Sequence, residues 1–373
     1  MKKYLLFLAA ALTLAACAKS ELSDEFNNNE ITFQVARYSS LTTKAEDYKT
    51  DYQNVPFGAY SWYKGISASD NTGFMDNQKV SYQAANNLWA PEGITYYWPK
   101  TGTLDFICYS PYTADGTAAP APTITESAIS YPAWNVNTNR TVDVMYSDKA
   151  VGLSNNTTTY NYNGVPVLFH HALSRLVFAC RLAYNDVTAA TGDKTKWEVT
   201  ISNITLKDVK TTGTLALDLN ADGTTWKKPD SNVWTNNDAK ADISLDVSNL
   251  TTFSSTTPQK VDSLLVLPQA LNEGQKVELT LTIKTFRDTG TGYAQVLQET
   301  DIPVNGTLAS GALTKWGINQ NIIYTFILAP SRPSGKGVDL DGDGIEDQDP
   351  TIIYFDPAVQ DWENVTVNAG INL

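Results

Sequence analysis

Short segments in which apolar and polar residues alternate run along most of this 373-residue chain. Side chains of a β-strand point alternately to its two faces, so a period of two predicts half-buried strands. The segments are rich in Val, Ile, Thr and aromatic residues, and clusters of Gly, Asn, Asp, Ser or Pro separate them. A short helix is expected only at residues 170–176 (HHALSRL). The pattern predicts an all-β sandwich fold, with strands at residues 31–37, 55–63, 103–110, 175–184, 197–206, 213–219, 241–247, 262–268, 276–286, 321–328 and 351–355.

The chain begins with a segment that has the layout of a lipoprotein export signal. Two lysines precede an apolar run that ends at Leu12, and small residues follow up to Cys17. The run is too short to span a bilayer. Residues 14–17 (LAAC) resemble the lipobox of bacterial lipoproteins, in which the cysteine carries a lipid such as palmitate and becomes the new N-terminus. We therefore expect residues 1–16 to be removed and Cys17 to be acylated; ordinary secretion, with a cysteine here by chance, is the alternative.

The length that remains after this signal suggests two domains rather than one. Residues 184–196 (YNDVTAATGDKTK) are polar and are the expected joint. This gives an N-terminal β-sandwich domain over residues 38–186 and a C-terminal one over residues 195–373. The formal net charge of −13 becomes more negative when the two lysines of the export signal leave. Such acidity argues against nucleic acid or anionic lipid as a partner.

Two segments near the ends of the chain carry the strand pattern with no evident partner in the sequence. Residues 365–373 (VTVNAGINL) have an apolar side chain at every second position, formed by Val365, Val367, Ala369, Ile371 and Leu373. In residues 31–37 (ITFQVAR) the corresponding stripe consists of Ile31, Phe33 and Val35. Arg37 ends this segment and is the only arginine before Arg140. A strand at residues 365–373 either docks into its own domain or is added to another molecule.

Several motifs together resemble the fimbrillins, the FimA-type and Mfa-like pilins of type V pili in Bacteroidales. The lipobox is one of them; the others are residues 96–112 (YYWPKTGTLDFICYSPY), 165–178 (VPVLFHHALSRLVF), 264–269 (LLVLPQ), 315–328 (KWGINQNIIYTFIL) and 356–365 (DPAVQDWENV). The resemblance implies two tandem transthyretin-like β-sandwich domains in one subunit, exported as a lipoprotein to the outer membrane and the cell surface. It also implies that an arginine-specific protease removes the N-terminal segment and that subunits polymerise by donor-strand exchange into a fimbrium, or pilus, for cell adhesion.

Applied to this chain, the resemblance assigns a role to both end segments. Cleavage between Arg37 and Tyr38 would release the propeptide 17–37 with its strand, leaving an apolar groove and an unpaired sheet edge. Residues 365–373 of a second copy would fill that groove, so a homopolymer is expected. Lys44 is the fallback cleavage site for a protease that accepts lysine. Ligands on host or bacterial surfaces are the remaining expected partners. A tip or an anchor subunit, which lacks one of the two end roles, is the alternative within the family.

One acidic loop, residues 339–349 (DLDGDGIEDQD), has metal-ligand spacing. Carboxylates at positions 1, 3, 5 and 9, with a glycine at position 6, resemble calcium loops of the EF-hand and thrombospondin-repeat kinds. Position 12, where a bidentate carboxylate is expected, is Pro350, so Asp349 or a residue from elsewhere has to complete the shell. Calcium is the expected cofactor, and a solvated acidic loop is the alternative. The expected ligands are Asp339, Asp341, Asp343, the carbonyl of Ile345, and Asp347.

Other patterns that carry chemistry are few. His170 and His171 are adjacent, so on a regular strand they cannot face one metal ion, and structural hydrogen bonds are expected. Cys108 and Cys180 lie in apolar strand segments, where either a disulfide or two buried thiols would fit. Hydrolase and phosphate-binding motifs are missing from the sequence, so no enzyme is expected. The nine Trp and nineteen Tyr residues are expected in sandwich cores; a surface lipoprotein that binds glycans on an aromatic platform is the alternative function.

Overall fold

The computed structural model describes the side chains and backbone of most of the chain, and the backbone alone for residues 187, 329 and 352–361. The fully described ranges are 29–35, 54–86, 88–113, 120–140, 142–155, 164–183, 185–186, 188, 194–218, 234–245, 247, 252–309 and 313–328. Regular structure in these residues is β apart from one 3-10 turn, η2 (Ala68–Asp70). The all-β sandwich prediction is confirmed. Across the same ranges, no helix has the length and apolar character needed to cross a membrane.

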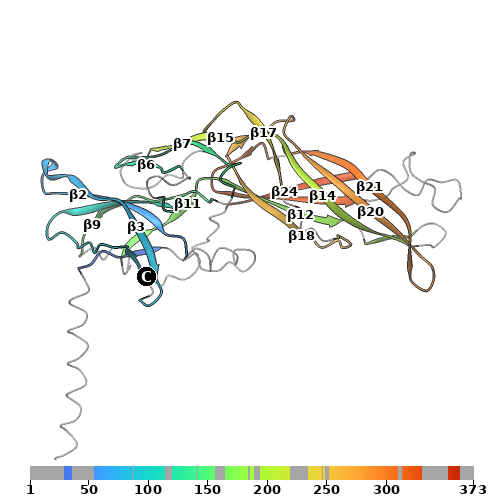
Figure 1. Ribbon diagram of the computed structural model, residues 1–373, viewed down its shortest axis with the longest axis horizontal. Helices are drawn as coiled ribbons and strands as arrows, with labels where there is room; N and C mark the ends of the chain where they lie inside the picture. Colours follow the sequence, from blue (N-terminus) through green and yellow to red (C-terminus); the bar gives the residue numbers. More distant parts are fainter. Residues whose placement is uncertain are drawn as a thin grey trace, which may run out of the picture. The chain divides into compact units, whose positions relative to one another are not determined.

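Two compact units make up the structure (Figure 1). The first unit comprises residues 1–112 and 147–169, and the second comprises residues 113–146 and 170–373. The sandwich domains expected from the sequence, residues 38–186 and 195–373, stay a prediction.

The first unit contains one large sheet. Its strands follow the order β10-β1-β4-β3-β2-β5, continued by β8 and β11, and β9 pairs with β5 beside this path. Strand β1 is parallel to β10 and antiparallel to β4. The strand bounds are β1 (Phe33–Val35), β2 (Phe57–Lys64), β3 (Thr72–Gln83), β4 (Leu88–Pro91), β5 (Thr103–Ser110), β8 (Met145–Ser147), β9 (Ala150–Leu153), β10 (Val165–Val167) and β11 (Phe169–His171).

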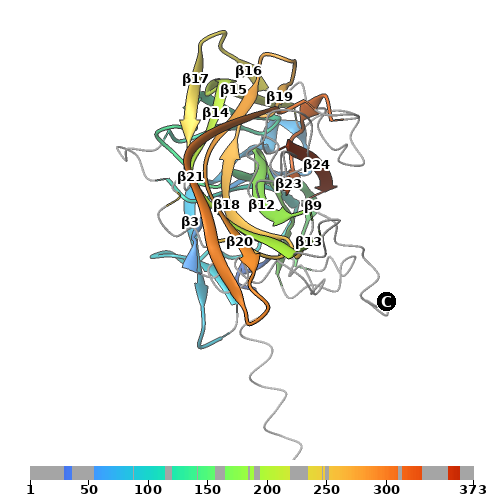
Figure 2. The same cartoon turned by 90° about the vertical axis from the view of Figure 1, so that its right-hand side faces the viewer.

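The second unit contains four sheets. Their orders are β18-β12-β23-β24, β13-β14-β20-β21 with β17 also on β14, β16-β15-β7-β6, and β19-β22. Figure 2 shows the long strands β14, β20 and β21 curving past the sheet of β12, β18 and β23. The bounds are β6 (Thr123–Thr125), β7 (Ala128–Asn135), β12 (Ser174–Leu182), β13 (Asp186–Thr188), β14 (Lys194–Lys210), β15 (Thr212–Asp218), β16 (Trp234–Asn236), β17 (Lys240–Ser244), β18 (Gln259–Val266), β19 (Gln269–Ala270), β20 (Lys276–Asp288), β21 (Tyr293–Thr307), β22 (Lys315–Trp316), β23 (Gln320–Ala329) and β24 (Ile352–Asp361).

The core of the second unit follows from the alternation in its strands. In β12 the side chains of Leu176 and Phe178 are fully buried. The Phe178 ring stacks on Tyr324 of β23 with centroids 5.8 Å apart. The Tyr324 hydroxyl accepts a hydrogen bond from Trp316 Nε1 and donates one to a backbone carbonyl. Burial raises the pKa of Tyr324 well above its ordinary value, so this hydroxyl keeps its proton and its place in the core.

One detail corrects an expectation from sequence. The segment 170–176, expected as a short helix, instead ends β11 and begins β12. The polar segment 184–196 contributes β13 and the start of β14, which pair with each other. Strand β7 pairs with β15, and such pairing depends on partners distant in sequence.

Candidate functional site

Strand β1 and the residues that precede it occupy an inner position of the first sheet. On one side, Ile31 N donates to Tyr96 O at 2.8 Å and Trp98 N donates to Asn29 O at 2.9 Å. On the other side, Val165 N donates to Thr32 O at 2.7 Å. Residues 29–35 therefore lie as one strand between two walls, the first formed by β4 and residues 96–98 and the second by β10.

The side chains of this segment alternate between core and solvent as the sequence predicts. Ile31 and Phe33 keep only 2% and 1% of their surface exposed. Val35 and Thr32 are intermediate, and Gln34 is exposed. Burial of each large apolar side chain contributes about 1.5–3 kcal/mol relative to leaving it in water. Two of the three residues of the predicted apolar stripe, Ile31 and Phe33, are thus buried within the same chain.

Phe33 is the centre of an aromatic cluster. Its ring meets Phe57 edge-on at 5.6 Å and Phe106 edge-on at 5.8 Å between centroids. Phe57 in turn contacts Trp89 and Phe169 at 5.4 and 5.5 Å. Edge-to-face aromatic pairs add to the stabilisation that burial alone provides. Without Phe33, two of these rings would lose a neighbour and an apolar site would open in the sheet.

Strand β10 is paired with the rest of the described sheet through β1. It lies at the end of the sheet order, where Pro166 has no N–H to donate, as is usual for an edge strand. Gly164, which precedes it, packs directly on β1: a Cβ atom there would lie 2.7 Å from the Thr32 carbonyl oxygen. The Gly164 φ of +147° also favours glycine. Glycine at this position therefore lets a strand lie against the second wall.

Several of these residues were not anticipated from the sequence. Alternation over residues 31–37 predicts the β1 stripe, whereas β4 and β10 lie in segments without a comparable stripe and were not predicted. The motif at residues 165–178 was noted for its resemblance, and its first residues prove to be β10. Tyr96 accepts the hydrogen bond from Ile31 N with its backbone carbonyl, and its side chain contacts Gln78 and Phe74. The side chain of Tyr97 is 53% exposed instead of filling a core.

The remaining predicted sites lie outside the described residues. These are the lipidation site Cys17, the cleavage site Arg37–Tyr38 with its fallback Lys44, the donor segment 365–373 and the acidic loop 339–349. Among the residues that are described, no cluster of His, Cys, Asp and Glu could hold a metal ion.

The histidines and cysteines form structural contacts. His171 Nδ1 lies 2.7 Å from Asp143 Oδ2, and the His170 ring stacks on Tyr146. Cys108 and Cys180 are buried free thiols. Burial raises the pKa of the Cys180 thiol to about 12 and that of Cys108 higher still, which makes both unreactive as thiolates.

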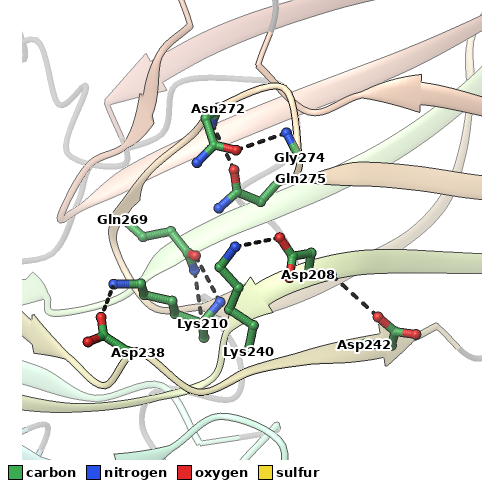
Figure 3. A network of polar contacts seen from close by, with 9 residues as sticks. All are labelled: Asp208, Lys210, Asp238, Lys240, Asp242, Gln269, Asn272, Gly274 and Gln275. Atoms are coloured by element: carbon green, nitrogen blue, oxygen red, sulfur yellow. Dashed lines mark hydrogen bonds and ion pairs between the residues drawn. The ribbon is translucent and has the colours of Figure 1, made fainter.

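A network of polar contacts in the second unit, shown in Figure 3, holds the end of β14. Lys240 of β17 pairs with Asp208, and Lys207 pairs with Asp242, so two exposed ion pairs join β14 and β17 beside a bulge. The side-chain amide of Gln269 exchanges two hydrogen bonds with the backbone of the last residue of β14. These groups pair with one another, and this arrangement serves the fold of the second unit.

Comparison with known proteins identifies the family of this chain. The profile of the fimbrillin-like family matches residues 43–353. The chain belongs to the fimbrillin-like family. The resemblance identified from motifs is confirmed. The matched region of this fimbrillin-like chain begins after β1 and ends before residue 365, so it tests neither the removable strand nor the donor segment.

A solved structure of a fimbrial protein has a similar fold. A crystal structure of a fimbrial protein from Bacteroides vulgatus matches with a TM-score of 0.52 at 14% identity, over 90% of this chain and 99% of that one. A putative cell adhesion protein from Bacteroides uniformis matches more weakly, with a TM-score of 0.45 at 17% identity over 90% and 98% of the two chains. No curated protein matches this fimbrillin-like chain in sequence.

Proposed function

We propose that this chain is a structural pilin subunit that is exported as a lipoprotein acylated on Cys17, cleaved after Arg37, and polymerised by donor-strand exchange into surface fimbriae for adhesion. The observation that carries the proposal is the place of β1, hydrogen-bonded on both sides inside the first sheet with Ile31 and Phe33 buried. Membership of the fimbrillin-like family supports the pilin role. The outer membrane is the proposed site of the lipid anchor.

Cleavage after Arg37 would change how β1 is held. Arg37 follows the last residue of β1, Val35, by two positions. After cleavage, only non-covalent contacts would hold residues 29–35. Burial of two or three apolar side chains contributes about 1.5–3 kcal/mol each, whereas ordering a free peptide costs about 1–2 kcal/mol for each backbone residue. A strand that is stable while tethered therefore becomes replaceable once it is cut.

Residues 365–373 have the properties required of the replacement. Nine extended residues span roughly 30 Å at about 3.3 Å each, and their alternate side chains are apolar. Strand addition of this kind derives affinity from backbone hydrogen bonds and specificity from pockets for alternate side chains. Strand β24, an edge strand of the second unit, ends at Asp361, and residues 362–364 connect it in sequence to the donor segment.

The direct test is limited cleavage of the purified full chain with an arginine-specific protease. We expect a product that begins at Tyr38 and forms filaments visible by electron microscopy. The variant Arg37→Ala should remain uncut at this site and form no filaments. Arg37→Lys is the matched control, because it keeps the charge and is cut only by a protease that accepts lysine. Normal filaments from Arg37→Ala would contradict the proposed trigger.

A second experiment separates the donor segment from the groove. Deletion of residues 365–373 should leave a folded monomer that is trimmed but does not polymerise. Loss of folding would show instead that the segment belongs to its own subunit. Trimmed full-length protein that binds a peptide of residues 363–373, yet never polymerises by itself, would identify a tip subunit. Retention of residues 29–35 in filaments would identify an anchor-like subunit.

A further inference from the structure

We propose that the donor segment enters the groove in the same direction and register as β1, with Val365 at the place of Ile31 and Val367 at the place of Phe33. The inference rests on the proposed function and adds the alignment of the two strands. It starts from a sequence match: residues 29–35 read NEITFQV and residues 363–369 read ENVTVNA. Both consist of two polar residues, an apolar residue, threonine, an apolar residue, a side-chain amide and an apolar residue.

The walls of the groove determine the direction of the incoming strand. The β4 wall pairs antiparallel with β1, whereas the β10 wall pairs parallel with it. Parallel and antiparallel ladders place their hydrogen bonds at different spacings. A reversed strand would have to pair parallel with β4 and antiparallel with β10. Its carbonyl and N–H groups would then not align with Val165 N and Tyr96 O as those of Thr32 and Ile31 do. A strand that runs as β1 does preserves both sets of bonds.

The burial of residues 29–35 determines the register. Asn29 and Glu30 are exposed, and the buried part of the groove begins at Ile31. The first apolar residue of the donor stripe, Val365, therefore belongs at Ile31, with two polar residues before it in the exposed positions. Shifting the donor by two residues puts Ala369 in the large site of Phe33. Shifting it by four puts Val367 at the exposed place of Asn29 and glycine at the place of Thr32.

The proposed register leaves the central site incompletely filled. Phe33 fills the space between the rings of Phe57 and Phe106, and Val367 has a smaller side chain. An underfilled apolar site loses contacts that a larger side chain would make. A donor with phenylalanine at residue 367 should therefore bind more tightly than the native segment. The same substitution at residue 371 should bring no such gain, because that residue lies beyond the place of Val35.

Cysteine pairs test the register directly. Gln34 is opposite Pro166 of β10 and points to the exposed side. The proposed register places Asn368 there, and the register shifted by four residues places Asn372 there. Facing Cα atoms in a sheet lie within the range that a disulfide spans, about 4.4–6.8 Å. The buried native thiols Cys108 and Cys180 should not compete under mild oxidation.

The experiment uses the full chain carrying Pro166→Cys together with either Asn368→Cys or Asn372→Cys, trimmed after Arg37 and oxidised. We expect a ladder of disulfide-linked oligomers on non-reducing gels for the first pair and monomers for the second. A ladder from the second pair, or equal ladders from both, would overturn the register while filaments of the parent protein uphold donor-strand exchange. Absence of filaments from the trimmed parent would overturn the proposed function itself.

A second measurement covers the case in which the cysteine variants do not assemble. Filaments of Val367→Phe should dissociate at a higher temperature than parent filaments, and those of Ile371→Phe should not. The opposite order would place Ile371 between the two phenylalanine rings and refute the proposed alignment.

Discussion

Replacement of Phe33 by alanine should separate the stability of the precursor from that of the polymer. The side chain is 1% exposed and lies between two aromatic rings at 5.6 and 5.8 Å. Truncation of a buried phenylalanine costs about 3–5 kcal/mol, which includes the lost contacts and the cavity that remains. In the uncut chain, this cost lowers the free energy with which β1 is held in the sheet. In the proposed filament, Phe33 would have left with the propeptide, and the loss should vanish.

Hydrogen exchange measured by mass spectrometry provides the assay, because it reports local opening of the sheet. In the precursor Phe33→Ala, peptides covering residues 29–35 and 164–167 should exchange faster, since Val165 N donates to Thr32 O. A change of about 3 kcal/mol corresponds to roughly a hundredfold more opening at room temperature. Once the chain is trimmed, assembly should be faster, since β1 is released more readily.

The control is Gln34→Ala, which alters an exposed side chain of the same strand. It should leave exchange and assembly close to those of the parent. Two results would refute the reasoning. Either the precursor Phe33→Ala exchanges like the parent, so that the aromatic contacts do not hold β1, or filaments made from it melt at a lower temperature than parent filaments, so that residue 33 persists in the polymer.

Three further predictions concern other parts of the chain. Gly164→Ala should weaken β1 docking by about 1–3 kcal/mol, through contact with the Thr32 carbonyl and strain at a positive φ; unchanged exchange of β10 amides would contradict this. We propose that the loop 339–349 binds calcium, so millimolar calcium should raise the melting temperature and chelator should lower it, whereas an unmoved melting temperature would count against a site. The hydrogen bond from Lys207 lowers the pKa of Asp242. This pair therefore stabilises the fold at pH values above the ordinary pKa of aspartate, and the stabilisation is lost as the pH falls through the lowered pKa of Asp242. Asp242→Asn should reduce the dependence of the free energy of unfolding on pH in this acidic range.

Strong alternation in the sequence predicted individual strands well. The expected segment 103–110 coincides with β5, and the expected segment 276–286 lies within β20. Strand β21 was not predicted, because most of its side chains are exposed, none is buried, and its sequence lacks an apolar stripe. The helix expected at residues 170–176 was wrong because two strands meet there at a bend, and their apolar residues imitate helical spacing.

The sequence by itself specified the all-β class, the two apolar stripes near the ends of the chain and the motifs of the fimbrillin-like family, because alternation and local motifs are properties of neighbouring residues. It could not reveal that β1 lies between β4 and β10, that Gly164 packs closely against β1, or that the Phe33 ring contacts Phe57 and Phe106. Those relations join residues up to more than a hundred positions apart, and they exist only once the sheet has formed. The physical reason is that the residues of a segment determine whether it can form a strand, whereas the hydrogen bonds and packing of the whole sheet determine which strands become its neighbours.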